Sequence, residues 1–250
     1  MLLIKIKMSK TKLIIALDLE TREQNLSLCK NLAKNNLNDL YLKVGLRSFI
    51  RDGVTFIKEL QDLGFKVFLD LKLYDIPNTM LDSIKEIIKL NVSMITIHAS
   101  SGRRAMSDIA NYLKDNSSSL VFAVSALTSF SKEEFKEIYN DEINKAILNF
   151  STIASECGIN GIVCSPLESG FIKNNINNIL TLTPGIRPIS SDFNNRIIMD
   201  DFKDDQKRIS SINAALKQKS DFIVIGRPIY NSKDPILITK YIISKLKEAK

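Results

Sequence analysis

The chain has 250 residues, of which 44% are hydrophobic and 25% are charged, and its formal net charge is +7 at pH 7. This composition is typical of a globular protein with one sizeable core. No stretch reaches roughly 18 consecutive apolar residues, and the apolar run at the N-terminus is too short for a secretion signal, which argues against a membrane or secreted protein. We therefore expect a cytoplasmic protein without a membrane partner.

The positive charge is spread along the chain and is not interleaved with aromatic residues. It predicts a solvated basic surface that attracts small anionic substrates, and argues against a nucleic-acid partner. The three cysteines, Cys29, Cys157 and Cys164, have neither zinc-site nor redox-pair spacing. Reduced, structural thiols are therefore expected.

Eight apolar runs rich in β-branched and aromatic residues predict eight strands. In chain order they cover residues 12–18, 40–45, 66–71, 94–98, 120–126, 161–165, 179–183 and 221–226. Segments with helical spacing of apolar residues separate them, and the last of these begins with Asp234 and Pro235. An aspartate cap followed by proline in the first turn is a typical helix start.

Strands that alternate with helices, without an intervening linker, indicate the α/β class and predict a single-domain (β/α)8 TIM barrel. A doubly wound sheet is the alternative. We interpret residues 11–250 as the barrel domain and 1–10 as an N-terminal tail, in which Met8 offers an alternative start.

Polar residues stand where the predicted strands end, which is where the active site of such a barrel lies. The first strand ends in Asp18, the second carries Lys43, and the third carries Asp70 and Lys72. Side chains two apart on a strand share a face, so Asp70 and Lys72 are predicted to point the same way. Asp75 follows in a turn announced by Pro77 and Asn78.

Buried charges must be paired, which predicts an alternating chain of Lys43, Asp70, Lys72 and an acid such as Asp75. An ion-pair network that only fills the end of the barrel is the alternative interpretation. His98, the single histidine, fits either a general base or a hydrogen-bonded residue at a strand end. The lysines among the carboxylates argue against a divalent ion, so neither a metal nor a cofactor is expected.

Two features after the seventh and eighth strands indicate a phosphate site. Arg187 lies in the sequence TPGIRP, and Gly226 directly precedes Arg227. A glycine allows a backbone N–H to approach an anion, and a guanidinium group binds phosphate through two nitrogens. Barrels often bind phosphate at this place.

Nine short motifs, in one fixed order, resemble the bacterial orotidine 5'-phosphate decarboxylase family. They are ALD at 16–18, LKVG at 42–45, DLKLYDIPNT at 70–79, HAS at 98–100, LTS at 127–129, VCSP at 163–166, TPGIRP at 183–188, DQKR at 205–208 and IGRPI at 225–229. The resemblance covers almost the whole chain. It implies a TIM barrel lyase that decarboxylates orotidine 5'-monophosphate to UMP in pyrimidine biosynthesis, without a cofactor.

The resemblance also implies residue roles. Lys72 would protonate C6 of the substrate, and Lys43, Asp70 and Asp75 would complete the charged array. In a homodimer, Asp75 and Thr79 would reach into the partner's site. The remaining substrate contacts would be Asp18 and Lys43 to the ribose, Thr128 to the pyrimidine, and Arg187, Gln206, Gly226 and Arg227 to the phosphate.

Two alternatives remain open from the sequence. Related magnesium-dependent sugar-phosphate decarboxylases and synthases share the D-x-K-x-x-D pattern, although the IPNT and LTS motifs favour a nucleotide substrate. A non-enzymatic binding barrel is disfavoured because both lysines and both aspartates are retained. The chain departs from the family at Leu73-Tyr74, where an aromatic-histidine pair is common, and at residues 189–204, a longer insertion that predicts a larger phosphate-covering lid.

Overall fold

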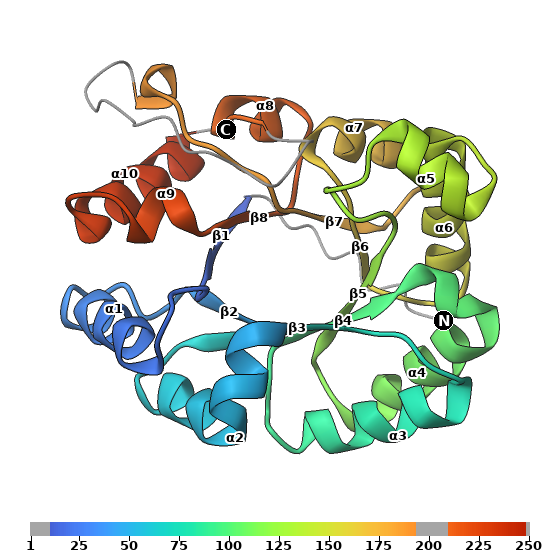
Figure 1. The fold of residues 1–250 in the computed structure, drawn as a ribbon, viewed down its shortest axis with the longest axis horizontal. Coiled ribbons are helices and arrows are strands. Elements are labelled where there is room, and N and C mark those ends of the chain that lie inside the picture. Colours follow the sequence, from blue (N-terminus) through green and yellow to red (C-terminus); the bar gives the residue numbers. More distant parts are fainter. Residues whose placement is uncertain (1–10, 194–209, 249–250) are drawn as a thin grey trace.

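All eight predicted strands are present, and they form a closed parallel barrel in the order β1 to β8 (Figure 1). The structure is a computed structural model that describes residues 11–193 and 210–248. The strands are β1 (Lys12–Ala16), β2 (Tyr41–Gly45), β3 (Lys66–Leu73), β4 (Met94–His98), β5 (Leu120–Val124), β6 (Gly161–Val163), β7 (Leu180–Thr183) and β8 (Phe222–Ile225). Pairing of β1 with β8, with Lys12 opposite Phe222, closes the ring. The TIM barrel prediction is therefore confirmed, and the doubly wound alternative is wrong.

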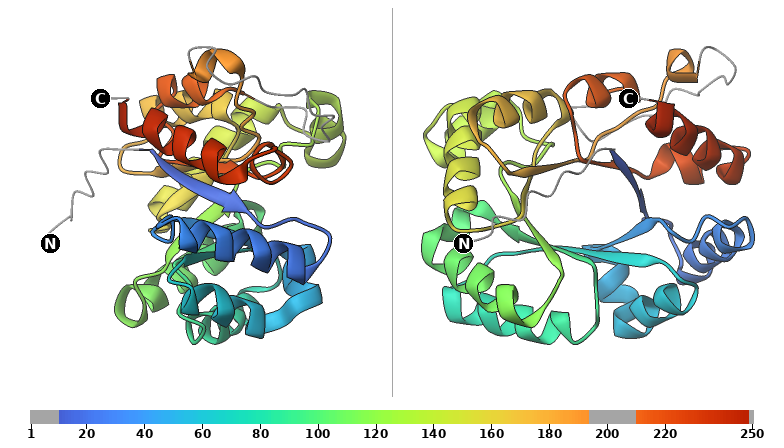
Figure 2. Two further views of the ribbon diagram at one scale, coloured as in Figure 1. Left: turned by 90° about the vertical axis from the view of Figure 1, so that its left-hand side faces the viewer. Right: turned by 180° about the vertical axis from the view of Figure 1, so that it is seen from behind.

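Helices surround the ring, as the right-hand view of Figure 2 shows. They are α1 (Arg22–Lys34), α2 (Leu46–Asp62), α3 (Pro77–Ile88), α4 (Gly102–Asn116), α5 (Lys132–Tyr139), α6 (Ile143–Glu156), α7 (Pro166–Asn175), α8 (Ile212–Lys217), α9 (Arg227–Tyr230) and α10 (Pro235–Glu248), with 3₁₀ turns η1 (Ala99–Ser101) and η2 (Ser190–Phe193). The predicted cap of the last helix is present, because Asp234 accepts a hydrogen bond from Leu237 N at 2.9 Å. Among the described residues, no helix has the length and apolar character needed to cross a membrane.

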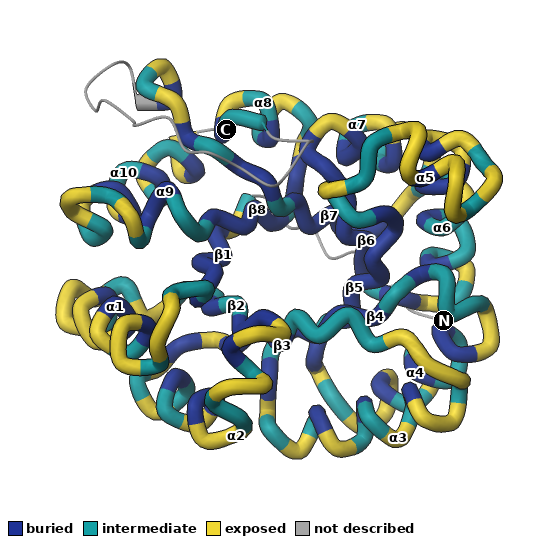
Figure 3. Tube along the Cα trace, viewed as in Figure 1, coloured by how far each residue is buried: buried dark blue, intermediate teal, exposed yellow. Residues whose placement is uncertain are grey.

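Two apolar layers stabilise the barrel. The inner layer fills the ring with side chains such as Phe68, Phe122 and Phe222, and the outer layer packs the other face of the strands against the helices. Figure 3 shows most of the barrel strands buried, with the carboxyl end of β3 as the main exception, whereas many exposed segments lie on the outer faces of the helices. The filled interior leaves the carboxyl ends of the strands as the place where polar side chains can meet.

The strand β3 departs from the regular geometry that the sequence analysis assumed. Leu69 pairs with Ile95 and Leu73 with Ile97, so four steps along β3 match two along β4. The irregularity contains Lys72, whose φ of 51° lies in the left-handed region. Simple alternation of side chains therefore does not explain how Asp70 and Lys72 meet.

Candidate active site

A cavity of about 230 Å³ lies at the carboxyl ends of the strands. Eight of the predicted site residues line it: Asp18, Lys43, Asp70, Lys72, Thr128, Arg187, Gly226 and Arg227. Asp75 and Thr79 do not line it, and both are exposed on the surface beyond β3. Gln206 lies outside the described residues, as do residues 194–204 of the predicted lid.

Four of these residues form an alternating row of charges, which we call the charged chain: Asp18, Lys43, Asp70 and Lys72. Lys43 Nζ lies 3.4 Å from Asp18 Oδ1 and 3.7 Å from Asp70 Oδ2, and Lys72 Nζ lies 2.9 Å from Asp70 Oδ1. The two middle side chains are 13% and 12% exposed, whereas Asp18 and Lys72 at the ends are 42% and 39% exposed. Within one subunit, the chain thus begins with Asp18, whereas the sequence had suggested Asp75 as the additional acid.

The charged chain keeps its two middle members, Lys43 and Asp70, ionised. Burial alone would lower the pKa of Lys43, but the carboxylates of Asp70 and Asp18 outweigh burial and leave this pKa raised. Burial alone would raise the pKa of Asp70, but Lys43, Lys72 and a hydrogen bond from Thr96 leave it lowered. The cavity therefore offers a fixed ammonium group and a fixed carboxylate side by side.

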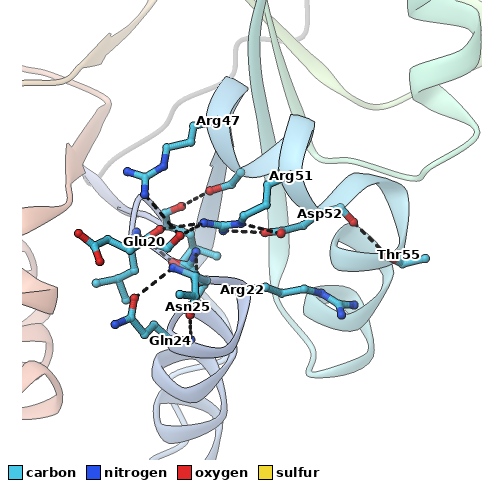
Figure 4. A network of polar contacts seen from close by, with 12 residues as sticks. Glu20, Arg22, Gln24, Asn25, Arg47, Arg51, Asp52 and Thr55 are labelled. Atoms are coloured by element: carbon cyan, nitrogen blue, oxygen red, sulfur yellow. Dashed lines mark hydrogen bonds and ion pairs between the residues drawn. The ribbon is translucent and has the colours of Figure 1, made fainter.

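Helix α2 holds the backbone on either side of Asp18. The buried Ser48 hydroxyl donates to Leu17 O at 2.7 Å, and the Arg51 guanidinium donates to Leu19 O at 3.2 Å and also to Glu20 O. Figure 4 shows Arg51 and its neighbour Arg47 directed at the loop around Glu20. We call the Ser48 and Arg51 bonds the α2 contacts. They fix the loop that carries the Asp18 carboxylate.

Asp52 and Gly53 determine the orientation of Arg51 and the direction of the first turns of α2. Asp52 accepts two hydrogen bonds of 2.7 Å from the Arg51 guanidinium and so orients it toward the loop. Directly afterwards Gly53 adopts a φ of 63° and a ψ of −159°, which kinks the helix. The first turns of α2 can therefore take their own direction at the mouth of the barrel, because glycine allows this backbone conformation without steric strain.

A hydroxyl group from β4 joins Asp70 to Lys72. Thr96 Oγ1 accepts a hydrogen bond from the backbone N–H of Lys72 at 2.9 Å and donates one to Asp70 Oδ1 at 2.9 Å. Thr96 is completely buried. The sequence analysis missed this residue, because a threonine in a strand is ordinary for its β-propensity alone.

Gly45 leaves the space that the Lys43 ammonium occupies. A Cβ atom built on Gly45 would lie 2.7 Å from Lys43 Nζ and 3.3 Å from Asp18 Oδ1. The LKVG motif thus has a local explanation, because any larger residue at its end would displace the lysine two positions earlier.

His98 takes part in local hydrogen bonding at the end of β4. Its Nδ1 lies 2.6 Å from Ser100 Oγ, and its ring lies 5.5 Å from that of Tyr74. Burial, together with the nearby Lys72 ammonium, lowers the pKa of His98. Because His98 does not line the cavity, its geometry fits the simpler interpretation of a hydrogen-bonded residue at a strand end.

Arg187, Gly226 and Arg227 occupy the side of the cavity formed by β7 and β8. Gly226 packs closely, since a Cβ atom there would lie 3.3 Å from both Ala16 Cβ and Tyr230 Cε1. Tyr230, which the sequence analysis missed, also lines the cavity. Its pKa is raised by burial and by the Asp18 carboxylate, so it presents a neutral hydroxyl group near the two arginines.

Asp192 fixes the backbone behind Arg187. Its buried carboxylate accepts hydrogen bonds from Ile189 N at 2.9 Å, Ile212 N at 3.2 Å and Asn213 N at 3.0 Å. The backbone N–H of Arg187 also donates to Ser210 O at 2.8 Å. Residues on both sides of the segment 194–209 are therefore held together beside the cavity.

Within residues 11–193 and 210–248, no cluster of three or more His, Cys, Asp or Glu side chains is arranged to hold a metal ion. In the charged chain, Lys43 lies between the two carboxylates that a divalent ion would need. Cys29, Cys157 and Cys164 form no disulfide bonds with one another. Burial raises the pKa of Cys29 to about 12, which makes its thiol unreactive.

Comparison with known proteins agrees with this geometry. The model of the Orotidine 5'-phosphate decarboxylase / HUMPS family matches residues 11–240. The chain belongs to this family. Curated orotidine 5'-phosphate decarboxylases from Nautilia profundicola and Campylobacter jejuni subsp. jejuni are each 49% identical to it, over 95% and 94% of this chain and 99% and 100% of theirs.

Solved structures of family members share the barrel. The orotidine 5'-phosphate decarboxylase of Lactobacillus acidophilus matches with a TM-score of 0.79 and 30% identity, over 94% of this chain and 99% of that chain. The enzyme of the same name from Pyrococcus horikoshii, at 20% identity and a TM-score of 0.70, shares the fold. Membership in the orotidine 5'-phosphate decarboxylase family, predicted from nine motifs, is confirmed.

Proposed function

We propose that the protein decarboxylates orotidine 5'-monophosphate to UMP and CO2 in pyrimidine biosynthesis, and that Lys72 protonates the substrate carbon. Membership in the family and relatives with 49% identity confirm the decarboxylase function predicted from the sequence. The observation that carries the mechanism is the 2.9 Å pair of Lys72 and Asp70 in the cavity. It places a proton donor next to a negative charge.

The chemistry requires a cation at the reacting carbon. Breaking the bond between C6 and the carboxylate leaves an electron pair on a vinylic carbon that no neighbouring group delocalises. The Lys72 ammonium stabilises that charge and then transfers a proton from Nζ to C6. The neutral lysine regains a proton from solvent, which its 39% exposed side chain can reach.

In this mechanism the substrate carboxylate binds beside Asp70. The two negative charges repel each other until CO2 leaves. At a separation of about 4 Å and an effective dielectric constant near 20, this repulsion is roughly 4 kcal/mol. Very slow reactions require on the order of 20 kcal/mol of catalysis. Preorganised charge around Lys72, together with binding energy from the distant phosphate group, must therefore supply most of the rate enhancement.

The rest of the cavity suits the remainder of the nucleotide. Asp18 and Lys43 bind the ribose hydroxyl groups, and Thr128 binds the pyrimidine edge. Arg187, Gly226 and Arg227 bind the phosphate, and Gln206 joins them from the segment outside the described residues. Carboxylates already neutralised by Lys43 support a metal-free reaction.

The protein acts as a cytoplasmic homodimer in which Asp75 and Thr79 complete the partner's site. Both residues are exposed, next to the 65% and 66% exposed side chains of Tyr74 and Ile76. On the neighbouring helix α2, Leu46 and Ile50 add further exposed apolar surface. Exposed apolar side chains in the segments that follow β2 and β3 support an interface at this end of the barrel.

The first experiment measures the loss of orotidine 5'-monophosphate absorbance by the purified protein in EDTA. The wild type is expected to turn over, whereas Lys72→Ala loses kcat by at least about 10⁴-fold, because charge stabilisation and general acid catalysis are both removed. UMP binding, measured by calorimetry, should persist in the variant. A folded wild type that requires magnesium, or prefers a sugar phosphate, would contradict the proposal.

A mixing experiment tests the shared site. Lys72→Ala and Asp75→Asn subunits, each nearly inactive alone, are unfolded together and refolded. If Asp75 acts in the partner's site, half of the dimers are mixed and each has one native site, so roughly a quarter of wild-type activity returns. Activity that stays at the level of the separate variants would show that both residues act within one subunit.

A further inference from the structure

The backbone of Lys72 has a conformation that long side chains rarely adopt. Six described residues other than glycine have positive φ, and four of them are asparagines, which tolerate this region well. Lys72 is the one that lies inside a strand, with a φ of 51°. Such a conformation persists only where the surrounding structure enforces it.

The backbone N–H of Lys72 is bound by the hydroxyl group of Thr96. Thr96 lies between Ile95 and Ile97, the two residues of β4 that pair with β3 on either side of its irregularity. It is therefore placed where ordinary ladder hydrogen bonds are interrupted. Its Oγ1 atom accepts the N–H of Lys72, which the irregularity would otherwise leave without a partner in the strand ladder.

One hydroxyl group has one hydrogen to donate. Because Thr96 Oγ1 accepts from Lys72 N at 2.9 Å, its own hydrogen is available to Asp70 Oδ1, also at 2.9 Å. Asp70 Oδ1 is the same oxygen that binds Lys72 Nζ. The backbone and the ammonium group of Lys72 are thus tied to one carboxylate through a single buried side chain.

We propose that Thr96 is a positioning residue that holds Lys72 in its left-handed conformation and aims Asp70 at the lysine ammonium. This inference rests on the proposed function, in which these two residues flank the reacting carbon. Thr96 does not line the cavity, so it is not expected to contact the substrate. It acts through the geometry of the two residues that do, where small displacements reduce rate strongly.

Two substitutions distinguish the role of the Thr96 hydroxyl group from that of the side-chain shape. Thr96→Val keeps the branched shape and removes the hydroxyl group, whereas Thr96→Ser keeps the hydroxyl group and removes a methyl group. We expect Thr96→Val to lower kcat about 10- to 100-fold, because it removes a buried hydroxyl group that donates to the carboxylate of an ion pair. UMP affinity should stay within about 3-fold in both variants, and Thr96→Ser should retain kcat within about 3-fold, since its hydroxyl group can make both bonds.

A crystal structure of each variant gives a readout that does not depend on turnover. In Thr96→Val, Lys72 should leave the left-handed region or move its Nζ away from Asp70, whereas Thr96→Ser should keep both. If the wild type turns over no orotidine 5'-monophosphate, the proposed function fails, and these structures still test the positioning role. If Thr96→Val does not fold, the pair of Thr96→Ala and Thr96→Ser makes the same comparison.

Several results would overturn the inference. These are a Thr96→Val enzyme with wild-type kcat, equal losses in the valine and serine variants, or an unchanged Lys72 backbone in the valine variant. Equal losses would mean that packing, and not the hydroxyl group, is what the position supplies.

Discussion

The two ends of the charged chain are held by different means. At the Asp18 end, the α2 contacts bind backbone carbonyl groups from outside the barrel, partly through the solvent-accessible Arg51. At the Lys72 end, a completely buried hydroxyl group inside the barrel wall binds both the backbone and the carboxylate. Water can replace the exposed Arg51 bonds at the first end, whereas it cannot reach the Thr96 bonds at the second. The end that carries the proposed proton donor, Lys72, is thus the end with less freedom to adjust.

The largest effect on stability and activity is expected at the middle of the charged chain, where its side chains are most buried. Lys43→Met removes the cation between two carboxylates and leaves Asp70 buried with one partner fewer. The free energy of unfolding should fall by about 3 kcal/mol, as for other broken buried pairs. Urea denaturation measures this change, and activity should also be lost.

The control for this variant lies at the opposite end of the barrel. Lys66 pairs with Asp39 where the side chains are 44% and 93% exposed. Lys66→Met should therefore change the free energy of unfolding by less than about 1 kcal/mol. Similar losses for the two lysine variants would contradict the importance of burial in the charged chain.

The second-largest effect is expected from a substitution that disturbs the charged chain sterically and removes none of its charges. Gly45→Ala places a methyl group 2.7 Å from Lys43 Nζ, although the φ of −84° at Gly45 is accessible to alanine. We expect kcat/KM to fall about 10-fold or more while the barrel stays folded, because the ammonium must move by at least several tenths of an ångström. Steady-state kinetics measures the change in kcat/KM, and circular dichroism shows whether the barrel is folded.

Gly158→Ala serves as its counterpart. Gly158 lies between α6 and β6 with a φ of 83°, far from the charged chain in the sequence, and a Cβ atom there would meet only Ala110 within 4 Å. This substitution should lower stability by about 1 kcal/mol through backbone strain and leave kcat/KM unchanged. A reversed outcome, with the activity loss at Gly158, would show that Gly45 does not act through Lys43.

Acid should destabilise the protein through Asp70. The folded pKa of this carboxyl group is lower than its unfolded value, so its ionised form contributes stability that is fully present above the unfolded value of about 3.9. That stability is lost as the pH falls through the folded value. The free energy of unfolding of the wild type should therefore decline below about pH 4 more steeply than that of Asp70→Asn. Parallel curves for the two proteins would exclude Asp70 as a source of the acid sensitivity.

The smallest effect is expected from the Arg51 bonds, which hold the backbone directly after Asp18. Arg51→Met removes the guanidinium bonds to Leu19 O and Glu20 O but leaves Ser48 in place. We expect kcat/KM to fall less than about 5-fold, and Arg51→Lys to lie between this variant and the wild type, since water can reach these carbonyl groups. A loss as large as that in Thr96→Val would remove the contrast between the two ends.

The sequence was sufficient to predict the eight strands, their closure into a barrel and the charges around its mouth. These features depend on local patterns: apolar runs of strand length, and polar residues that follow them. Lys43 and Asp70 could be paired in advance because a buried charge requires a partner. Arg187, Gly226 and Arg227 indicated a phosphate site by their positions after the last two strands, and the family motifs then added roles for Thr128 and Gln206.

Other parts of the site could not be predicted, because they depend on contacts between distant segments. Nothing in the run DLKL indicates that Lys72 has a left-handed backbone, and Thr96 lies 24 positions further along the chain. The bonds from Arg51 to carbonyl oxygens involve no partner side chain, so they leave no pair of residue types in the sequence. Tyr230 could have been predicted more easily, because it follows Arg227 by three residues in IGRPIY.

Asp192 has a consequence for how this barrel can diversify. Its carboxylate joins Ile189 to Ile212 and Asn213, so the ends of the intervening sequence stay together whatever that sequence contains. Lengthening a segment whose ends are already fixed is inexpensive, at about 0.6 kcal/mol for each doubling. Evolution, or a protein engineer, can therefore exchange residues 194–209 for segments of other lengths while Arg187 keeps its place, provided that the aspartate remains.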